Sequence, residues 1–217
     1  MLNDIIYQLH NSNLGDHWTS YGLMTVLGAR HRTRYRLGTL NMGGDYTQRL
    51  AEIDQLFQAN EHRPILVRAE GQEKVDAWMN WVYPAIPVDS HLRWNFYDIG
   101  KTVCYQFDGI SSAADKNPDK VLEFQIRMFF KEQGFRTIRL GGHLTLIEAT
   151  RHLSQCSLFV GCDSGFSHMA HSVGCPTLIY RGNLPFDHVH RFKQYQSFRG
   201  MVELEDRVRH WLELLKL

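Results

Sequence analysis

Short apolar runs alternate with helix-like segments along almost the whole chain. In the helix-like segments, apolar residues recur every three or four positions, as on one face of an amphipathic helix. Strands are predicted at 4–10, 35–40, 64–68, 102–107, 137–140, 158–162 and 177–180. Helices are predicted at 17–29, 45–57, 75–82, 121–133, 144–154 and 167–173, and from 203 onwards. This alternation is typical of α/β folds whose parallel sheets are covered by helices on both faces.

The chain divides into two halves of similar pattern, joined near residues 87–100. We predict two small Rossmann-like halves, an N-terminal domain over 1–95 and a C-terminal domain over 96–200. A last helix, over 201–217, is expected to pack against the body. Because open α/β sheets bind ligands at the carboxyl ends of their strands, the loops after the strands are the candidate sites.

The amino-acid composition excludes few classes of function. The 217 residues carry a formal net charge of +1, so no global field requires a nucleic acid or a membrane as partner. The four cysteines form no C-x-x-C pair and are expected to be buried thiols rather than disulfide or zinc ligands. The N-terminus lacks a basic segment followed by an apolar core, and no apolar run approaches the length of a membrane span. A cytoplasmic location is therefore expected.

The most informative stretch begins where the apolar run 158–162 meets the sequence DSGFSHMA at 163–170. Because a strand, a turn and a helix start meet here, backbone N–H groups and the positive helix end would point above the sheet, where they favour a phosphate. Gly165 would let the backbone approach a ligand closely, Ser164 or Ser167 could cap the helix, and His168 could reach the same anion. The stretch predicts a bound nucleotide diphosphate, and a capped turn without a ligand is the alternative.

A second loop, 108–116, follows the first strand of the C-terminal half. Its adjacent hydroxyls, Ser111 and Ser112, and the mobile positive charge of Lys116 suit phosphate oxygens. A solvated turn is the alternative for this loop taken alone.

A third loop, with Asn13, Gly15, Asp16 and His17, follows the first strand of the N-terminal half. The Asp16 carboxylate, on a glycine turn that faces the ligand of the other half, could act as a general base. Asp16 could equally be the N-cap of the helix that follows, and the two roles are compatible.

Taken together, these residues resemble the heptosyltransferase family of bacterial lipopolysaccharide synthesis, glycosyltransferase family nine, best over residues 111–187. The resemblance implies the GT-B fold, in which two Rossmann-like halves face each other across a cleft. It also implies a nucleotide-sugar donor on the C-terminal half and an acceptor on the N-terminal half. The residues that would bind the donor diphosphate are Ser111, Ser112, Lys116, Gly165, Phe166 and His168.

The same resemblance assigns the remaining site residues. Leu144 would lie by the nucleoside, while Asp163 and Ser164 would orient the donor loop. Asp16 would be the catalytic base. The acceptor loop would be formed by Asn13, Gly15 and His17.

The chain departs from the family pattern in two respects. The family is usually half as long again, and the N-terminal half of this chain is predicted to have a sheet of only three strands. The residues after Lys116 are Asn-Pro-Asp instead of an aromatic-containing stretch.

The expected reaction moves a sugar from a nucleotide-diphosphate sugar to an acceptor hydroxyl in a single displacement, which inverts the anomeric configuration. No Asp-x-Asp motif lies at a predicted strand end, so neither a catalytic metal nor another cofactor is expected. The acceptor is either a saccharide, including lipopolysaccharide, or a modified nucleic-acid base. Cations interleaved with aromatic residues at 30–36, 93–97 and 190–195 could hold a nucleic acid, or could be solvated loops and helix ends.

Two other functions stay open at this point. One is a nucleotide-sugar epimerase or hydrolase of the same fold, which usually has Gly-Gly after the serine, where this chain has Gly165 and Phe166. The other is a nucleotide-sugar-binding module without chemistry, for which the short N-terminal half would suffice.

Overall fold

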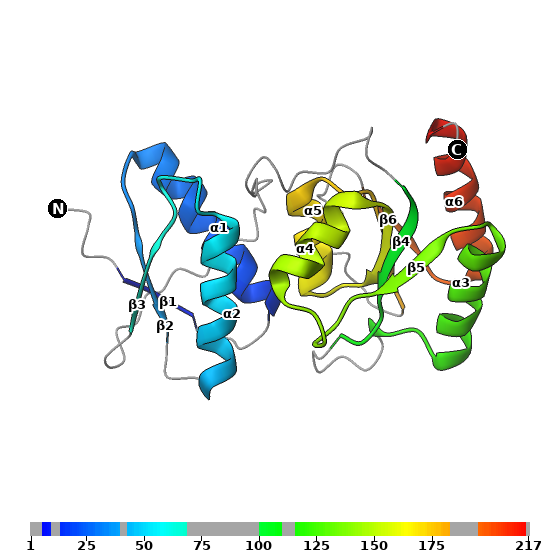
Figure 1. Cartoon of the computed structure of the whole chain (residues 1–217), viewed down its shortest axis with the longest axis horizontal. Coiled ribbons are helices and arrows are strands. Elements are labelled where there is room, and N and C mark those ends of the chain that lie inside the picture. Colours follow the sequence, from blue (N-terminus) through cyan, green and yellow to red (C-terminus); the bar gives the residue numbers. More distant parts are fainter. Residues whose placement is uncertain are drawn as a thin grey trace.

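The computed structural model describes residues 6–9, 14–39, 43–68, 100–109, 116–182 and 195–215. In this part of the chain, two parallel sheets lie one after the other along the long axis of the molecule (Figure 1). Helices lie between the two sheets, and other helices cover the outer face of the C-terminal sheet (Figure 1).

Within the described residues, the N-terminal half is a three-stranded sheet with two crossover helices. β1 (Ile6–Leu9), β2 (Arg36–Thr39) and β3 (Ile65–Arg68) are parallel and lie in the order β1-β2-β3. α1 (Leu14–His31) connects β1 to β2, and α2 (Gly43–Leu56) follows β2. Parallel neighbours need such crossovers, and both helices lie on the side of this sheet that faces the C-terminal half (Figure 1).

The C-terminal half contains a five-stranded parallel sheet in the order β5-β4-β6-β7-β8. Its strands are β4 (Gly100–Gln106), β5 (Arg136–Arg139), β6 (Cys156–Cys162), β7 (Thr177–Tyr180) and β8 (Tyr195–Phe198). The chain enters at β4, passes to β5 on one side and then returns to β6 on the other side. The strand order therefore reverses between β4 and β6, which is the point where open α/β sheets bind their ligands.

In the part of the C-terminal half that the structure describes, four helices accompany the sheet. α4 (Leu146–Gln155) and α5 (Gly165–Val173) face the N-terminal half, whereas α3 (Lys120–Glu132) and α6 (Met201–Leu215) cover the opposite face (Figure 1). Gly174 ends α5 with a φ of 87°, a left-handed conformation that glycine adopts without strain. The chain can therefore turn sharply into β7.

One apolar core continues from the N-terminal half into the C-terminal half. Its members include Trp18, Tyr21, Phe57, Met169 and Val173. α1 packs against α5, and α2 packs against α4. Across this boundary Trp18 Nε1 donates a hydrogen bond to Ser172 Oγ at 2.7 Å, and the backbone N–H of Leu146 donates to Glu52 Oε2 at 2.7 Å. The halves are therefore joined by buried contacts as well as by the chain.

A second core lies between the C-terminal sheet and its outer helices. It includes Val103 and Leu158 from the strands, Ile126 from α3, and Leu204 and Val208 from α6. The C-terminal helix thus packs against the body of the protein, and its apolar positions recur at helical spacing.

The predicted α/β architecture with parallel sheets is confirmed, with differences at several element ends. α1 begins at Leu14 rather than near 17, and α2 begins at Gly43 rather than at Asp45 or Thr47. Strand β8 was not predicted, because Tyr195–Phe198 has no run of apolar residues. The predicted helix 75–82 lies outside the described residues.

The cysteines and the helices agree with two further expectations. Cys104, Cys156, Cys162 and Cys175 are all buried and form no disulfide. Among the described helices, none is long and apolar enough to cross a membrane.

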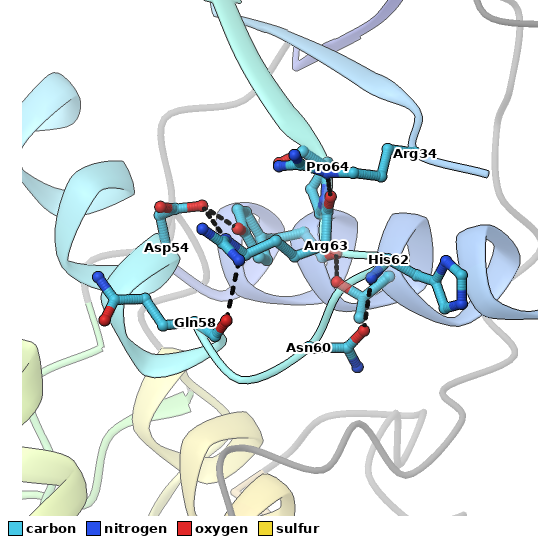
Figure 2. Close-up of polar contacts among 9 residues, drawn as sticks. Arg34, Asp54, Gln58, Asn60, His62, Arg63 and Pro64 are labelled. Atoms are coloured by element: carbon cyan, nitrogen blue, oxygen red, sulfur yellow. Dashed lines mark hydrogen bonds and ion pairs between the residues drawn. The ribbon is translucent and has the colours of Figure 1, made fainter. Parts of the chain in front are cut away.

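A polar network fixes the turn between α2 and β3 (Figure 2). The buried Tyr21 hydroxyl of α1 donates to Asp54 Oδ1, and Arg63 Nε donates to the same oxygen at 3.2 Å. Arg63 Nη1 also donates to the carbonyl of Gln58 at 2.9 Å. Burial and the hydrogen bond to Asp54 raise the pKa of Tyr21 above its usual value, so the phenol stays a neutral donor.

Replacing Asp54 with alanine is expected to lower the free energy of unfolding by about 1–3 kcal/mol, because it leaves the buried Tyr21 hydroxyl without its acceptor. The matched control is Glu61→Ala, which removes an exposed carboxylate paired with His62 at 3.3 Å and should change stability by less than about 0.5 kcal/mol. Urea unfolding followed by circular dichroism measures both variants. Equal effects of the two substitutions would contradict this role of Asp54.

Candidate active site

The candidate site lies at the carboxyl ends of β4 and β6, where the strand order reverses. Gln106, the last residue of β4, is opposite Gly161 of β6 and is only 5 % exposed. Its Oε1 accepts hydrogen bonds from Ser164 Oγ at 2.8 Å and from Cys162 Sγ at 3.6 Å. Gln106 therefore ties the turn after β6 to the end of the neighbouring strand.

A second connection joins the two ends of the loop that follows β4. The backbone N–H of Gly109 donates to Asn117 Oδ1 at 2.9 Å, and Asn117 Nδ2 donates to the carbonyl of Gly109 at 3.1 Å. The segment between them carries the predicted hydroxyls Ser111 and Ser112, which lie outside the described residues. The loop ends are thus fixed beside β6.

Lys116 and Asp163, two predicted donor-site residues, lie together at this edge. Lys116 Nζ is 3.5 Å from Asp163 Oδ2, and their side chains are only 18 % and 12 % exposed. This pair brings together the loop after β4 and the turn after β6. A cation is therefore held at the switch point of the sheet, where a phosphate group would meet it.

A neighbouring ion network holds the ends of β4 and β5. Asp108 pairs with Arg139, and Lys120 Nζ lies 3.5 Å from Asp108 Oδ1. The Arg139 guanidinium keeps the pKa of the Asp108 carboxyl below its usual value. Because all three side chains are exposed, this network is a structural tie rather than a buried reactive group.

The N-terminus of α5 follows directly after Asp163. Ser164 occupies the N-cap position, and its N–H donates to Ser167 Oγ at 3.2 Å, while Ser167 Oγ donates back to the Ser164 carbonyl. The N–H groups of Gly165 and Phe166 lie in the first turn, where no intrahelical carbonyl can accept them. They carry the partial positive charge that attracts an anion.

The N-terminus of α1 lies beside the N-terminus of α5. A Cβ atom at Gly15 would be 3.2 Å from His168 Cδ2 and 3.6 Å from the Cα of Gly165. A Cβ atom at Gly165 would be 2.6 Å from Cγ of Leu14 and 2.8 Å from its Cβ. Gly165 therefore permits the close approach of the two helices, whereas a side chain at Gly15 would only press on the His168 ring. The sequence interpretation assigned the space at Gly165 to a ligand, but Leu14 fills it.

The two helices run side by side in the same direction. Near the N-termini of the two helices, Gly15 lies against His168. One turn further along, Trp18 donates a hydrogen bond to Ser172. Their positive ends consequently lie at the same place, and their electrostatic effects on an anion add. Asp16 is the third residue of α1, so the alternative that Asp16 is the N-cap of this helix is wrong, because the helix already begins at Leu14.

Three histidines near this junction are buried to different degrees. His168 is 8 % exposed and His17 only 1 % exposed, so His17 lies inside the shared core region rather than in an open loop. Burial and the neighbouring His168 lower the pKa of His171 to about 4. His171 is therefore neutral near pH 7.

The remaining predicted residues are placed as follows. Leu144 precedes α4 and Phe166 lies in α5, and both are half-buried against the shared core. Asn13 lies outside the described residues. The structure thus brings Gly15, Gly165 and His168 together at the helix junction, and Lys116 and Asp163 at the strand ends next to it.

Sequence reasoning missed Gln106 and Asn117. The signal for Gln106 was a glutamine at the end of an otherwise apolar strand, and the signal for Asn117 was the Asn-Pro-Asp departure after Lys116. Neither signal identifies the partner, because Gln106 bonds to the turn after β6 and Asn117 to the backbone of Gly109 in the loop after β4.

Arg34, in the basic segment 30–36, binds backbone carbonyl groups of this protein. Arg34 Nε donates to the carbonyl of Arg63 at 2.8 Å, and Arg34 Nη2 reaches the carbonyl of Pro64 at 3.5 Å (Figure 2). Arg34 thus holds the entry to β3. Residues 93–97 and 190–194, the other basic and aromatic segments, lie outside the described residues.

No group of three or more His, Cys, Asp or Glu side chains is arranged to hold a metal ion in the ranges that the structure describes.

Comparison with known proteins places this site in a family context. A family model described as glycosyltransferase family 9 (heptosyltransferase) matches residues 117–184, which include the turn after β6 and the start of α5. No curated protein matches the chain in sequence.

Solved structures match over nearly the whole chain. The iron-containing dodecameric glycosyltransferase TibC of enterotoxigenic E. coli has 14 % identity and a TM-score of 0.59, covering 100 % of this chain and 80 % of that one. The E. coli heptosyltransferase WaaC, solved with ADP-2-deoxy-2-fluoro heptose, has 11 % identity and a TM-score of 0.51, covering 96 % and 98 %. A TibC complex with ADP-D-beta-D-heptose has 15 % identity and a TM-score of 0.55, covering 92 % and 64 %.

These matches confirm the predicted resemblance to heptosyltransferases and the predicted GT-B fold. The family model over residues 117–184 supports a glycosyltransferase, whereas the solved structures, at 15 % identity or less, support the fold.

Proposed function

We propose that this heptosyltransferase-like glycosyltransferase moves a sugar from a nucleotide-diphosphate sugar to a saccharide hydroxyl, with inversion and without a metal ion. One observation carries the proposal: the N-termini of α1 and α5 meet beside the ion pair of Lys116 and Asp163 at the switch point of the C-terminal sheet. That arrangement favours a doubly charged leaving group next to the N-terminal half.

The donor diphosphate would be bound where its charge develops. Breaking the glycosidic bond leaves a negative charge on the diphosphate, and preorganised donors lower the barrier when they point at that charge. The N–H groups of Gly165 and Phe166, the Lys116 ammonium and His168 would supply this stabilisation. Because these groups are cationic or dipolar, they would take the place that a metal ion holds in other transferases.

The complexes of TibC and WaaC favour an adenosine diphosphate sugar as donor. Leu144, at the start of the segment before α4, would lie by the nucleoside, and Asp163 would orient the loop by pairing with Lys116. Asp16, in the first turn of α1, would take the proton from the acceptor hydroxyl as it attacks the anomeric carbon.

A saccharide acceptor is favoured over a modified nucleic-acid base. The net charge is +1, whereas domains that bind nucleic acids usually carry a clear excess of positive charge. Arg34, from the basic segment, already holds backbone carbonyls. Incubation with ADP-sugars and a panel of saccharides and oligonucleotides, followed by mass spectrometry, tests this choice, since a sugar added only to oligonucleotides would reject it.

The donor site is tested by thermal unfolding with ADP, UDP, GDP, CMP and TDP. A nucleotide present at a hundred times its dissociation constant stabilises the fold by about 2.7 kcal/mol, which is a rise of several degrees in the midpoint. We expect ADP to give the largest rise. Lys116→Ala should weaken ADP binding by about 10- to 100-fold, because it removes a charged hydrogen-bond donor from the diphosphate.

The matched control is Lys131→Ala, which removes an exposed lysine in the last turn of α3 and should leave ADP binding unchanged. Binding of none of the five nucleotides would contradict the proposal. Once an acceptor is found, the anomeric configuration of the product by NMR tests inversion. Transfer in excess EDTA tests independence from metal ions, and loss of activity there would reject that part.

A further inference from the structure

The Asn117 side chain forms the pair of hydrogen bonds to one residue that a neighbouring strand's backbone would normally form. Its side-chain amide accepts from the N–H of Gly109 at 2.9 Å and donates to the carbonyl of Gly109 at 3.1 Å. Two hydrogen bonds to one residue fix both the distance and the orientation between Gly109 and Asn117. The side chain thus replaces one step of a strand pairing at the end of β4.

Gly109 itself is held against β6. A Cβ atom at Gly109 would lie 3.1 Å from Cys162 Sγ and 3.2 Å from Asn117 Oδ1. Position 109 therefore has no room for a larger side chain without displacing its neighbours. Cys162 is in turn bonded to Gln106 at the end of β4. Through Gly109, Asn117 is anchored to both strands of the switch point.

The backbone on the other side of Asn117 is also restricted. Pro118 confines the residue before it to extended conformations. Asp119 then caps α3, because its Oδ1 accepts from the N–H of Leu122 at 2.7 Å. The residues Asn-Pro-Asp thus lead into the start of α3 and are held to the end of β4 through the hydrogen bonds between Asn117 and Gly109.

Lys116 is the residue directly before Asn117. Lysine carries its charge on a flexible four-carbon stem, so its position at a site depends on where the backbone places the base of that stem. The two hydrogen bonds between Asn117 and Gly109 fix the backbone at the start of the lysine side chain. The ion pair with Asp163 at 3.5 Å holds the ammonium group. The ammonium group can then move from Asp163 to a phosphate with the base of the stem unchanged.

We propose that Asn117 is a positioning residue for the Lys116 ammonium in nucleoside diphosphate binding. This inference rests on the proposed function. Asn117 itself does not touch the diphosphate, and it acts by fixing the backbone from which Lys116 reaches it. A purely structural role would stabilise the fold but would not depend on the presence of the lysine side chain.

A double-mutant cycle with ADP as the probe separates these two roles. The dissociation constant is measured from the shift of the thermal unfolding midpoint over an ADP titration into the millimolar range, which also resolves weak binding. Asn117→Ala is expected to raise the dissociation constant about tenfold in the otherwise unchanged protein and less than about twofold in Lys116→Ala. Asn60→Ala is the matched control, because Asn60 Oδ1 likewise accepts a backbone N–H, that of His62 at 3.0 Å, in the other half.

The outcomes distinguish the inference from the proposed function. If the unchanged protein binds none of the nucleoside diphosphates, the proposed function fails and the inference fails with it. If the protein binds ADP and Lys116→Ala weakens it, the inference alone is overturned by unchanged binding in Asn117→Ala. It is also overturned by an equal loss from Asn117→Ala with and without Lys116, or by a loss of similar size in Asn60→Ala.

Discussion

Trp18→Ala is expected to lower the free energy of unfolding by about 3–5 kcal/mol, as for other large aromatic residues removed from a core. The Trp18 side chain is 0 % exposed, and its ring centroid lies 5.5 Å from that of Phe57. Its indole Nε1 bonds to Ser172 of α5, whose hydroxyl donates to the carbonyl of His168 at 3.0 Å. The substitution therefore removes packing and a polar contact at the boundary between the halves.

Because the core is shared, the C-terminal half should also open more easily in Trp18→Ala. All four cysteines are buried in that half, so their rate of reaction with a thiol reagent reports its opening. We expect faster labelling together with a lower urea midpoint by circular dichroism. The comparison variant is Trp211→Ala on α6, which removes a half-buried tryptophan from the second core and should cost less. Weakened stability without faster labelling would mean that the halves unfold independently.

The strands and helices could be predicted where the pattern is local. The strand 177–180 was predicted with the bounds that β7 has, because Gly174 and Pro176 end the preceding helix and an apolar run follows them. β8 could not be predicted in this way. It pairs with β7 alone among the described strands, and its two middle residues, Gln196 and Ser197, are polar, so its sequence has no apolar run.

Contacts between the two halves explain why the start of α1 was predicted at the wrong residue. The polar residues before position 17 favoured a loop, yet α1 begins at Leu14, whose side chain packs on Gly165 of the other half. This contact cannot be predicted from either segment alone, because the two residues lie far apart in the sequence. The same holds for Gly165, whose missing side chain was attributed to a ligand when the space belongs to Leu14.

The types of residue at the candidate site could be predicted from the sequence, but the residues that hold its loops in place could not. The Asp-Ser-Gly turn and Lys116 follow from the chemistry that a phosphate needs at strand ends. Gln106 bonds to Ser164, 58 residues further along the chain, and only the arrangement of β4 and β6 brings these two residues together. Asn117 bonds to Gly109, eight residues before it, and no local apolar pattern indicates that pairing.

Asp16→Asn is expected to lower kcat by about 10²- to 10⁴-fold, the usual contribution of a general base. Asparagine has nearly the same shape as aspartate but cannot accept the proton of the acceptor hydroxyl. Residue 16 follows Gly15, which lies against His168 and Gly165, so its backbone is next to the donor site. ADP binding should change little, because ADP contains no acceptor. Release of ADP from the donor, measured with the acceptor found in the saccharide panel, gives kcat.

A purely structural role for Asp16 predicts a different result from the same substitution. Asp16 lies inside the first turn of α1, where a negative charge stabilises the helix N-terminus, so a structural residue would lose about 0.3–1 kcal/mol of stability in Asp16→Asn and keep its kcat. The charge-matched control is Asp108→Asn, which removes a carboxylate from the end of β4 that already pairs with Arg139. A large fall in kcat for Asp16→Asn alone, with an unchanged unfolding midpoint, would identify the base. Equal falls in both variants would indicate a general effect of negative charge near the site, and Asp16 would then be removed from the chemistry.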